Sequence, residues 1–352
     1  MTVIFSFLTY NSSFYICVVL YIQPILKWVV IKKEEKGMSV MITGGTGFIG
    51  SYLTKKLVAE GEDGIILMDA QPSPASVDDM IERVEIVQGD FSEASHVMAI
   101  LKKHDISCVF HLGYLGGPEL ERSPSRAIRV NCEATSNLFE MACIAGVQRV
   151  VWASSSAIFG RAATSENPEL LNEEARPAPD TYYGACKLFN ENIAEIYAQR
   201  FGFDHIAVRI TSIYGLGRVG RKGLLGSPDI FSQLIEKAAR SETVIAPPEN
   251  HRFYWSYVKD CAEAFYCAYR AAKPKHRIFN FSGEIRTIRE TVGYLRTLFP
   301  QASIDMGTEP AVILNCLKTD RIREELGFVP RYSMEEGIKD YVDHLLGHSA
   351  QQ

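Results

Sequence analysis

The chain has 352 residues, of which 47% are hydrophobic and 22% are charged, and its formal net charge is −5. This composition is that of an ordinary soluble globular protein, and the length suffices for one large domain or two small ones. The negative charge excludes the basic surface typical of nucleic-acid-binding proteins. The eight cysteines are scattered, without a CxxC pair or zinc-ligand spacing. We therefore expect free thiols in a reducing compartment, a cytoplasmic location and no metal.

The first 37 residues differ from the rest of the chain. Residues 14–31 are strongly apolar, with an interruption at Gln23 and Pro24, and a charged run follows them. A stretch of this length is near the lower limit for crossing a bilayer, and lysines after it are typical of a cytoplasmic side. Three interpretations stay open for residues 1–37: a mis-assigned start upstream of Met38, a membrane anchor that contacts the bilayer through residues 14–31 and carries a cytoplasmic catalytic domain, or an additional packed element.

From Met38 onward, short apolar runs alternate with segments of helical periodicity. Alternating strands and helices imply a doubly wound parallel sheet of the Rossmann type, and continuous apolar strands fit a sheet that is covered on both faces. We expect this domain over residues 38–214. The predicted strands are 40–42, 65–68, 84–87, 108–112, 149–153 and 206–210, and the predicted helices are 48–58, 93–103, 126–145 and 183–201.

The alternation ends near Gly215. Helices are predicted near 229–240, 261–272, 287–298, 319–326 and 334–346, with short strands at 244–245 and 278–281. We expect residues 215–347 to form mainly a smaller substrate-binding domain. Such a domain would close over the carboxyl edge of the sheet, where open α/β sheets bind their ligands.

A glycine-rich turn joins the first predicted strand of the sheet to its first helix. Its glycines satisfy two dinucleotide-binding spacings, one through Gly44, Gly47 and Gly50 and one that begins at Gly45. A helix N-terminus at this place offers free N–H groups to a pyrophosphate, and glycines let the backbone approach it. Phe48 and Ile49 start the helix. The alternative is a turn that binds nothing, because either spacing by itself is a weak signal.

Asp69 adds a second signal for a dinucleotide. It ends the next strand, about 20 residues past the last glycine, where a carboxylate accepts hydrogen bonds from the adenosine ribose. A carboxylate at this position repels a 2′-phosphate, and the residues directly after Asp69 include no arginine. The sequence therefore favours NAD over NADP.

Tyr183 and Lys187 are four residues apart, so they share one face of the predicted helix. A tyrosine has a pKa of about 10, and a neighbouring ammonium favours the phenolate and lowers that value. Ser155 and its neighbours follow the strand 149–153, where a hydroxyl can polarise a reacting oxygen. A nicotinamide would supply the hydride chemistry that side chains lack.

Eight motifs in chain order resemble the extended short-chain dehydrogenase/reductase family, in its branch of sugar-nucleotide epimerases and dehydratases. The resemblance covers residues 38–346. The motifs are TGGTGFIG at 43–50, Asp69, GDF at 89–91, FHLG at 110–113, Asn131, SSSAIFG at 154–160, YYGACK at 182–187 and RITSIYG at 209–215.

The resemblance implies a role for each matching residue. Tyr183 is the general acid/base, and Lys187 lowers the pKa of this tyrosine and holds the nicotinamide ribose. Ser155 is the preferred catalytic hydroxyl, Ser156 is the second candidate, and Ser154 is interpreted as a strand-end residue. Relatives also suggest a homodimer that pairs through helices 126–145 and 183–201. The cofactor-binding residues implied are Gly44, Gly47, Phe48, Ile49, Gly50, Asp69, Asp90, Phe91, Leu112, Gly113, Tyr183 and Lys187, whereas Asn131, His111 and Cys186 are interpreted as packing residues.

Departures from the family pattern bear on the substrate. Ser156 stands where dehydratases of the family place an acidic residue, so dehydration is disfavoured. Ser212 replaces an asparagine that meets the pyrophosphate of nucleotide sugars, and Arg252 lies one place off the family's arginine. The candidate substrate-binding residues are Ser156, Ser212 and Arg252. The sequence therefore predicts an NAD-dependent epimerase or dehydrogenase of a sugar or nucleotide sugar. Two alternatives stay open: a dehydrogenase of a small hydroxy acid, hydroxy amino acid or uronate, and a non-catalytic NAD-binding regulator.

Overall fold

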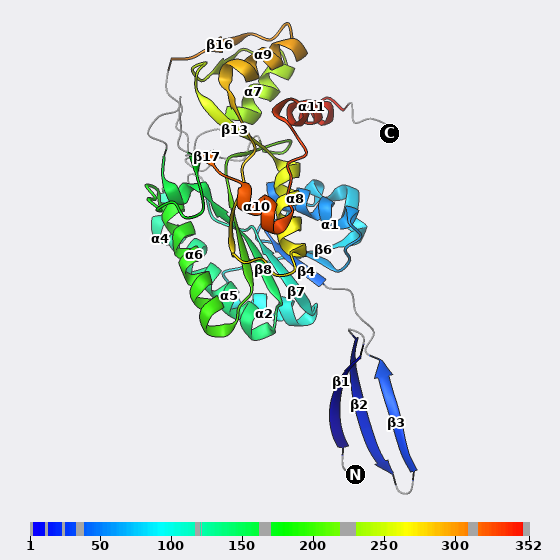
Figure 1. Cartoon of the computed structure of the whole chain (residues 1–352). Helices are drawn as coiled ribbons and strands as arrows, with labels where there is room; N and C mark the ends of the chain where they lie inside the picture. The colour runs from blue at the N-terminus through cyan, green and yellow to red at the C-terminus, as the bar shows by residue number, and fades with distance from the viewer. Residues whose placement is uncertain are drawn as a thin grey trace. The chain divides into compact units, whose positions relative to one another are not determined.

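A computed structural model describes residues 39–116, 120, 122–161, 170–218, 230–308 and 316–347, together with the backbone of three strands between residues 3 and 32 (Figure 1). The contacts within the chain divide it into two compact units, Met1–Gly37 and Met38–Gln352.

The N-terminal unit is an antiparallel sheet of three strands in the order β1-β2-β3. The strands are β1 (Val3–Tyr10), β2 (Ser13–Ile22) and β3 (Ile25–Lys32). The apolar stretch 14–31 is thus divided between two strands and does not form one continuous helix. Within the described part of the chain, no helix has the length and apolar character that crossing a membrane requires.

The second unit is built on a seven-stranded parallel sheet with the order β14-β10-β8-β7-β4-β5-β6. All six strands predicted for the dinucleotide-binding domain are present, and the doubly wound fold is confirmed. The strands are β4 (Ser39–Thr43), β5 (Ile65–Asp69), β6 (Val84–Gln88), β7 (Ile106–His111), β8 (Arg149–Ser155), β10 (His205–Ile210) and β14 (Ile278–Asn280).

Helices cover both faces of this sheet (Figure 1). Successive strand residues point to opposite faces, so Val40 and Ile42 pack in one apolar cluster and Met41 packs in the other. The cluster around Met41 includes side chains of α2 (Ala94–Lys103), α5 (Ala134–Ala145) and α6 (Tyr182–Phe201), and the cluster around Val40 includes side chains of α1 (Phe48–Ala59) and α8 (Val258–Arg270). Two buried faces explain why the strands are apolar without alternation.

The predicted helix 126–145 is interrupted by a turn of π-helix. It consists of α4 (Pro124–Ile128), the π-helical turn Arg129–Glu133 and α5. Single π-helical turns occur frequently at functional sites. The end of the helix is as predicted, because Gly146 adopts a left-handed conformation with φ 75° and caps it.

Beyond β10, the chain builds smaller sheets, one of which includes the earlier strand β9, and it also adds β14 to the large sheet. These sheets are formed by β11 (Ile213–Tyr214), β13 (Arg252–Tyr257) and β15 (Glu284–Thr287), by β12 (Val244–Ala246) and β16 (Ile304–Met306), and by β9 (Leu170–Leu171) and β17 (Cys316–Leu317). The helices are α7 (Ile230–Ala239), α9 (Ile288–Leu298), α10 (Asp320–Leu326) and α11 (Met334–Leu345). Because β14 joins the large sheet, residues after 215 contribute both to this sheet and to the smaller sheets.

The packing of α11 against β11 and β13 leads to a stability prediction. Tyr214 is fully buried, with its ring 5.2 Å from the rings of Trp255 and Tyr257, and a Cβ on Gly337 would lie 2.1 Å from its Oη atom. Because the tyrosine ring is held on both sides, we expect Gly337→Ala to lower the free energy of unfolding by about 1–3 kcal/mol.

Gly293→Ala is the matched control, since a Cβ there has no heavy atom within 4 Å. This change in α9 should leave the free energy of unfolding unchanged or raise it by up to about 1 kcal/mol. Urea denaturation of the two variants measures both values. Equal stability of the two variants would contradict the packing of α11.

Candidate active site

The glycine loop follows β4 at the point where the strand order of the sheet reverses. Gly44 has φ +69°, a conformation that glycine adopts without strain, and its N–H donates to the carbonyl of Met68 at 2.8 Å. A Cβ on Gly44 would lie 3.1 Å from the Cα atom of Gly113, at the end of β7. The two strand ends therefore approach each other through backbone alone, in the crevice where dinucleotides bind in such sheets.

Helix α1 begins directly behind this loop. Its first residue is Phe48, its N-cap is Gly47, and no side chain caps it. A Cβ on Gly50 would lie 2.2 Å from the carbonyl oxygen of Gly44, so only glycine lets α1 start this close to the loop. Backbone N–H groups at the start of a 12-residue helix thus lie directly behind a glycine-rich loop. This cradle fits the pyrophosphate of a dinucleotide.

Asp69 ends β5 beside the loop. Thr46 Oγ1 donates to Asp69 Oδ2 at 2.8 Å, and the N–H of Gln71 donates to Oδ1 at 3.1 Å. These bonds orient a half-buried carboxylate that the sequence assigns to the adenosine ribose. Thr46 is missing from the prediction, because nothing in the spacing of the motif connects its side chain to a residue 23 positions later.

The opposite wall of the crevice is formed by residues after β6 and β7. Phe91 packs edge-on against the His111 ring at 4.9 Å between centroids. A Cβ on Gly113 would lie 3.1 Å from the Phe91 ring. Asp90 is exposed beside it. His111 is buried between the hydroxyls of Thr43, at 2.7 Å, and Thr135, at 3.1 Å, and burial lowers its pKa to about 3. A neutral histidine held in this way is a packing residue, as expected.

Tyr183 and Ser155 meet at the carboxyl end of β8. Their side chains form a hydrogen bond. A Cβ on Gly184 would lie 2.3 Å from the carbonyl oxygen of Ala157, so α6 starts in direct contact with the loop after the strand. Lys187 Nζ donates to the carbonyl of Ala153 at 2.6 Å and lies 5.5 Å from the centroid of the Tyr183 ring. The structure thus brings together the three residues that the sequence proposes as catalytic.

The pKa of Tyr183 differs in direction from the sequence-based expectation. Burial, with a smaller contribution from Tyr114, raises the pKa of Tyr183, and the hydrogen bond with Ser155 opposes the rise only in part. Burial also lowers the pKa of Lys187 to about 8. Lys187 is therefore still largely an ammonium at neutral pH, whereas the Tyr183 phenol is protonated in the protein alone.

The three consecutive serines have different surroundings. Ser154 Oγ donates to Glu191 at 2.5 Å, and Ser155 accepts from the N–H of Ala157 at 3.1 Å in addition to its bond with Tyr183. Ser156 is fully buried, and its Oγ atom has no hydrogen-bond partner among the described residues. This arrangement supports Ser155 as the first choice and places Ser156 away from an open surface.

Two further features of the site are absent from the sequence-based prediction. Tyr114 follows β7, is 42% exposed and packs edge-on against Tyr183 with 5.6 Å between ring centroids. The Lys187 ammonium lies near both phenol rings, 5.7 Å from the centroid of Tyr114 and 5.5 Å from that of Tyr183. Arg209 and Glu191 form a buried bidentate pair at 2.9 and 2.8 Å. Neither feature has a local sequence signal. Tyr114 is a partly exposed aromatic residue after a strand, and the charges of Arg209 and Glu191 lie on elements that meet only in the fold.

Besides the buried Ser156, the substrate-binding candidates lie on or next to the smaller sheets. Ser212 is exposed just before β11, and Arg252 is exposed at the first residue of β13, the strand that pairs with β11. Ser212 is one residue before Ile213, which pairs with Ser256, so the two candidates lie several residues apart along the sheet. Asn131 binds both backbone groups of Leu115, at 2.8 and 2.7 Å, and acts as a structural residue, as expected.

The strand order of the sheet, and the glycine cradle at the point where this order reverses, define a dinucleotide-binding protein of the doubly wound α/β class. The chain belongs to the NAD dependent epimerase/dehydratase family, whose model matches residues 40–281. It is an NAD-dependent enzyme of the extended short-chain dehydrogenase/reductase type, so the family and the cofactor that the sequence predicts are confirmed.

Known relatives include enzymes of sugar nucleotides. UDP-glucose 4-epimerase of Azospirillum brasilense is 26% identical over 322 residues, which cover 85% of this chain and 89% of the relative. The structure of MoeE5 in complex with UDP-glucuronic acid and NAD is 26% identical, with a TM-score of 0.72 over 88% of this chain and 99% of MoeE5. The holo form of a GalE-like L-threonine dehydrogenase from Cupriavidus necator, at 21% identity, shares the fold, with a TM-score of 0.77 over 87% of this chain and 99% of that enzyme.

The Asp69 carboxylate leads to a prediction about cofactor choice. We expect Asp69→Ala to weaken NAD binding tenfold or more, because each hydrogen bond to a charged group contributes about 1.5–3 kcal/mol. The variant should also discriminate less against NADP, since the charge that repels a 2′-phosphate is gone. Isothermal titration with each dinucleotide measures both effects. Asp63→Ala, which removes an exposed carboxylate beside β5, is the control and should change neither affinity; an unchanged NAD affinity in Asp69→Ala would contradict the assignment.

Proposed function

We propose that this enzyme oxidises a secondary hydroxyl of a sugar or nucleotide sugar with NAD, and that Ser155, Tyr183 and Lys187 are its catalytic residues. The observation that carries the proposal is the hydrogen bond between Tyr183 and Ser155 at the carboxyl end of β8, with the ammonium of Lys187 against the tyrosine ring. Two hydroxyls and one ammonium converge beside the crevice of the glycine loop. This set has the general acid/base and the polarising donor that such an oxidation requires.

Each residue has a distinct task in this proposal. NAD, when bound, supplies a nicotinamide that accepts hydride from the carbon that bears the hydroxyl. The Tyr183 oxygen takes the hydroxyl proton, and Ser155 orients the oxygen that loses it. Lys187 stabilises the phenolate and holds the nicotinamide ribose. Because burial raises the pKa of Tyr183 in the protein alone, nearby positive charge is needed to form the phenolate near neutral pH.

The relatives support the substrate class, and residues from Ser212 onward are the proposed contacts. UDP-glucose 4-epimerase and MoeE5 act on or bind UDP-sugars by their names, and this chain aligns with each over most of its length. We propose that residues 215–347 mainly bind the substrate and that exposed Ser212 and Arg252 contact it. The Arg252 guanidinium is a cation suited to a phosphate or carboxylate group.

A second candidate is a dehydrogenase of a small hydroxy acid, hydroxy amino acid or uronate. It is favoured by Ser212 in place of an asparagine and by the displaced Arg252, both of which reduce the expected contacts to a pyrophosphate. The fold accommodates both substrate classes, since an L-threonine dehydrogenase shares it. The non-catalytic alternative is disfavoured because Tyr183 and Lys187 are both present and adjacent.

Turnover distinguishes the possible reactions. Net formation of NADH with a substrate would indicate a dehydrogenase, in which the keto product leaves. Conversion of a nucleotide sugar to its epimer without net NADH would indicate that the keto intermediate is reduced again on its other face.

Tyr183→Phe tests the catalytic assignment. We expect it to lower kcat by about 10²–10⁴, because general acid/base catalysis contributes that much, while NAD binding is retained. Tyr182→Phe is the matched control: this neighbouring tyrosine is 48% exposed on the same turn of α6 and should leave kcat unchanged. Steady-state rates with a nucleotide sugar and NAD give both values. A Tyr183→Phe variant as active as Tyr182→Phe would contradict the assignment.

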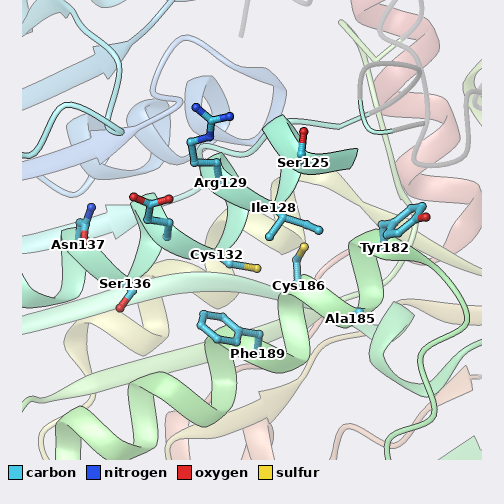
Figure 2. Close-up of a pocket in the computed structure, with 11 residues that line it drawn as sticks. Ser125, Ile128, Arg129, Cys132, Ser136, Asn137, Tyr182, Ala185, Cys186 and Phe189 are labelled. Atoms are coloured by element: carbon cyan, nitrogen blue, oxygen red, sulfur yellow. The ribbon is translucent and has the colours of Figure 1, made fainter. Parts of the chain in front are cut away.

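We also propose that the chain pairs as a homodimer through the helices at 124–145 and 182–201. A largely apolar groove of about 730 Å³ lies between them (Figure 2). Its lining includes Ile128, Tyr182, Ala185 and Phe189, and Phe189 is 42% exposed. An exposed apolar surface between two long helices is typical of an interface.

Phe189→Glu is expected to shift the chain from dimer to monomer at micromolar concentration, because it places a charge in an apolar contact. Multi-angle light scattering after size-exclusion chromatography measures the mass. Ile245→Glu is the control, since Ile245 on β12 is 66% exposed and does not line the groove, and it should leave the mass unchanged. A monomeric wild-type chain would overturn the dimer itself.

A further inference from the structure

Two cysteines from different elements meet in the groove between the helices. Cys132 lies in the π-helical turn and Cys186 lies in the first turns of α6, and both side chains line the groove. The two thiols are close enough for each to shift the pKa of the other. Figure 2 shows the Cys132 sulfur directed toward the Cys186 side chain, with Ile128 above both. Both thiols are free.

The surroundings of the pair make its two members chemically different. The interaction with Cys132 and the nearby charge of Lys187 lower the pKa of Cys186. The same interaction, together with burial, raises the pKa of Cys132. The thiolate is the nucleophilic form of cysteine, so Cys186 is the attacking thiol and Cys132 is the thiol that resolves the product.

We propose that Cys132 and Cys186 are a modification site, at which a hydroperoxide converts the dithiol into an intramolecular disulfide. The Cys186 thiolate attacks the terminal peroxide oxygen, the O–O bond breaks, and hydroxide leaves from hydrogen peroxide or an alkoxide from an organic hydroperoxide, so that Cys186 becomes a sulfenic acid. Cys132 then attacks this sulfur and water leaves. Two cysteine sulfurs are oxidised by two electrons in total, and one hydroperoxide is reduced.

Access and compartment are consistent with this chemistry. Cys132 and Cys186 are only 8% and 4% exposed, but both line a groove at the surface, so we expect a small peroxide to reach them without unfolding of the chain. Disulfides in a reducing compartment are usually transient or redox-sensing, and thiol–disulfide exchange reverses them. The other described cysteines have no thiol partner of this kind in the part of the chain that the structure describes.

The bond would act on the candidate active site through the chain itself. Cys186 directly precedes Lys187, whose ammonium holds the carbonyl of Ala153, and Cys132 directly follows Asn131, which fixes Leu115 and accepts from Asn190 at 2.8 Å. A disulfide has a shorter, fixed geometry than a pair of free thiols. Closing it draws α6 and the π-helical turn together and displaces Lys187, so the oxidised enzyme should bind NAD severalfold more weakly. This consequence rests on the proposed role of Lys187, whereas disulfide formation does not.

Mass spectrometry of the full chain after treatment with hydrogen peroxide tests the site. The wild type should lose two hydrogen atoms, yield a cross-linked peptide that contains Cys132 and Cys186, and regain its mass with dithiothreitol. Cys143→Ser is the matched control on the neighbouring α5 and should behave like the wild type. Cys132→Ser and Cys186→Ser should each fail to lose the two hydrogens. Addition of oxygen without loss of hydrogen, or a cross-link to another cysteine, would overturn the proposal.

The treatment is performed at a concentration at which the chain sediments as a monomer, because the groove is also the face that we propose pairs two copies. If no dimer exists, the groove is open at every concentration and the test is unaffected. NAD affinity is then measured on oxidised and reduced protein. An unchanged dissociation constant alongside a mapped disulfide would contradict the effect on Lys187 and leave the modification site established.

Discussion

The candidate site depends on the way that α6 is fixed to the carboxyl ends of two strands. Lys187 donates to the carbonyl of Ala153 at the end of β8, and Glu191, one turn further on, forms a bidentate pair with Arg209 on β10. Ser154 donates to the same glutamate. Buried charges are stable only when they are paired and hydrogen-bonded, so this network admits one position of the helix. That position brings Tyr183 to Ser155.

The second half of the crevice depends on backbone contact. Gly44 and Gly113 let the ends of β4 and β7 approach, and Gly50 lets α1 begin against the loop. Together, the two groups of contacts set the distance between the glycine cradle and the candidate catalytic side chains. The chemistry is thus positioned by two structural features on opposite sides of the point where the strand order reverses.

Much of this arrangement can be predicted from the sequence, because it depends on local patterns. Apolar runs separated by helical periodicity predict the strands of the doubly wound sheet, and the spacing of Tyr183 and Lys187 predicts one shared helix face. The buried Glu191–Arg209 pair and the bond from Thr46 to Asp69 depend on tertiary contacts between distant residues. The direction of the Tyr183 pKa shift depends on burial, which spacing does not show, and the two-residue strands β9, β11 and β17 are too short to have a pattern.

We propose that this NAD-dependent enzyme acts on a sugar or nucleotide sugar, and a nucleotide sugar is the substrate that the relatives favour. The midpoint of thermal unfolding of the NAD-bound chain tests this proposal, with and without a panel of nucleotide sugars, uronates, hydroxy acids and hydroxy amino acids. A ligand that binds only the folded state raises the midpoint in proportion to its occupancy. We expect a rise with at least one nucleotide sugar. A rise with a small hydroxy acid, hydroxy amino acid or uronate, and with no nucleotide sugar, would contradict it.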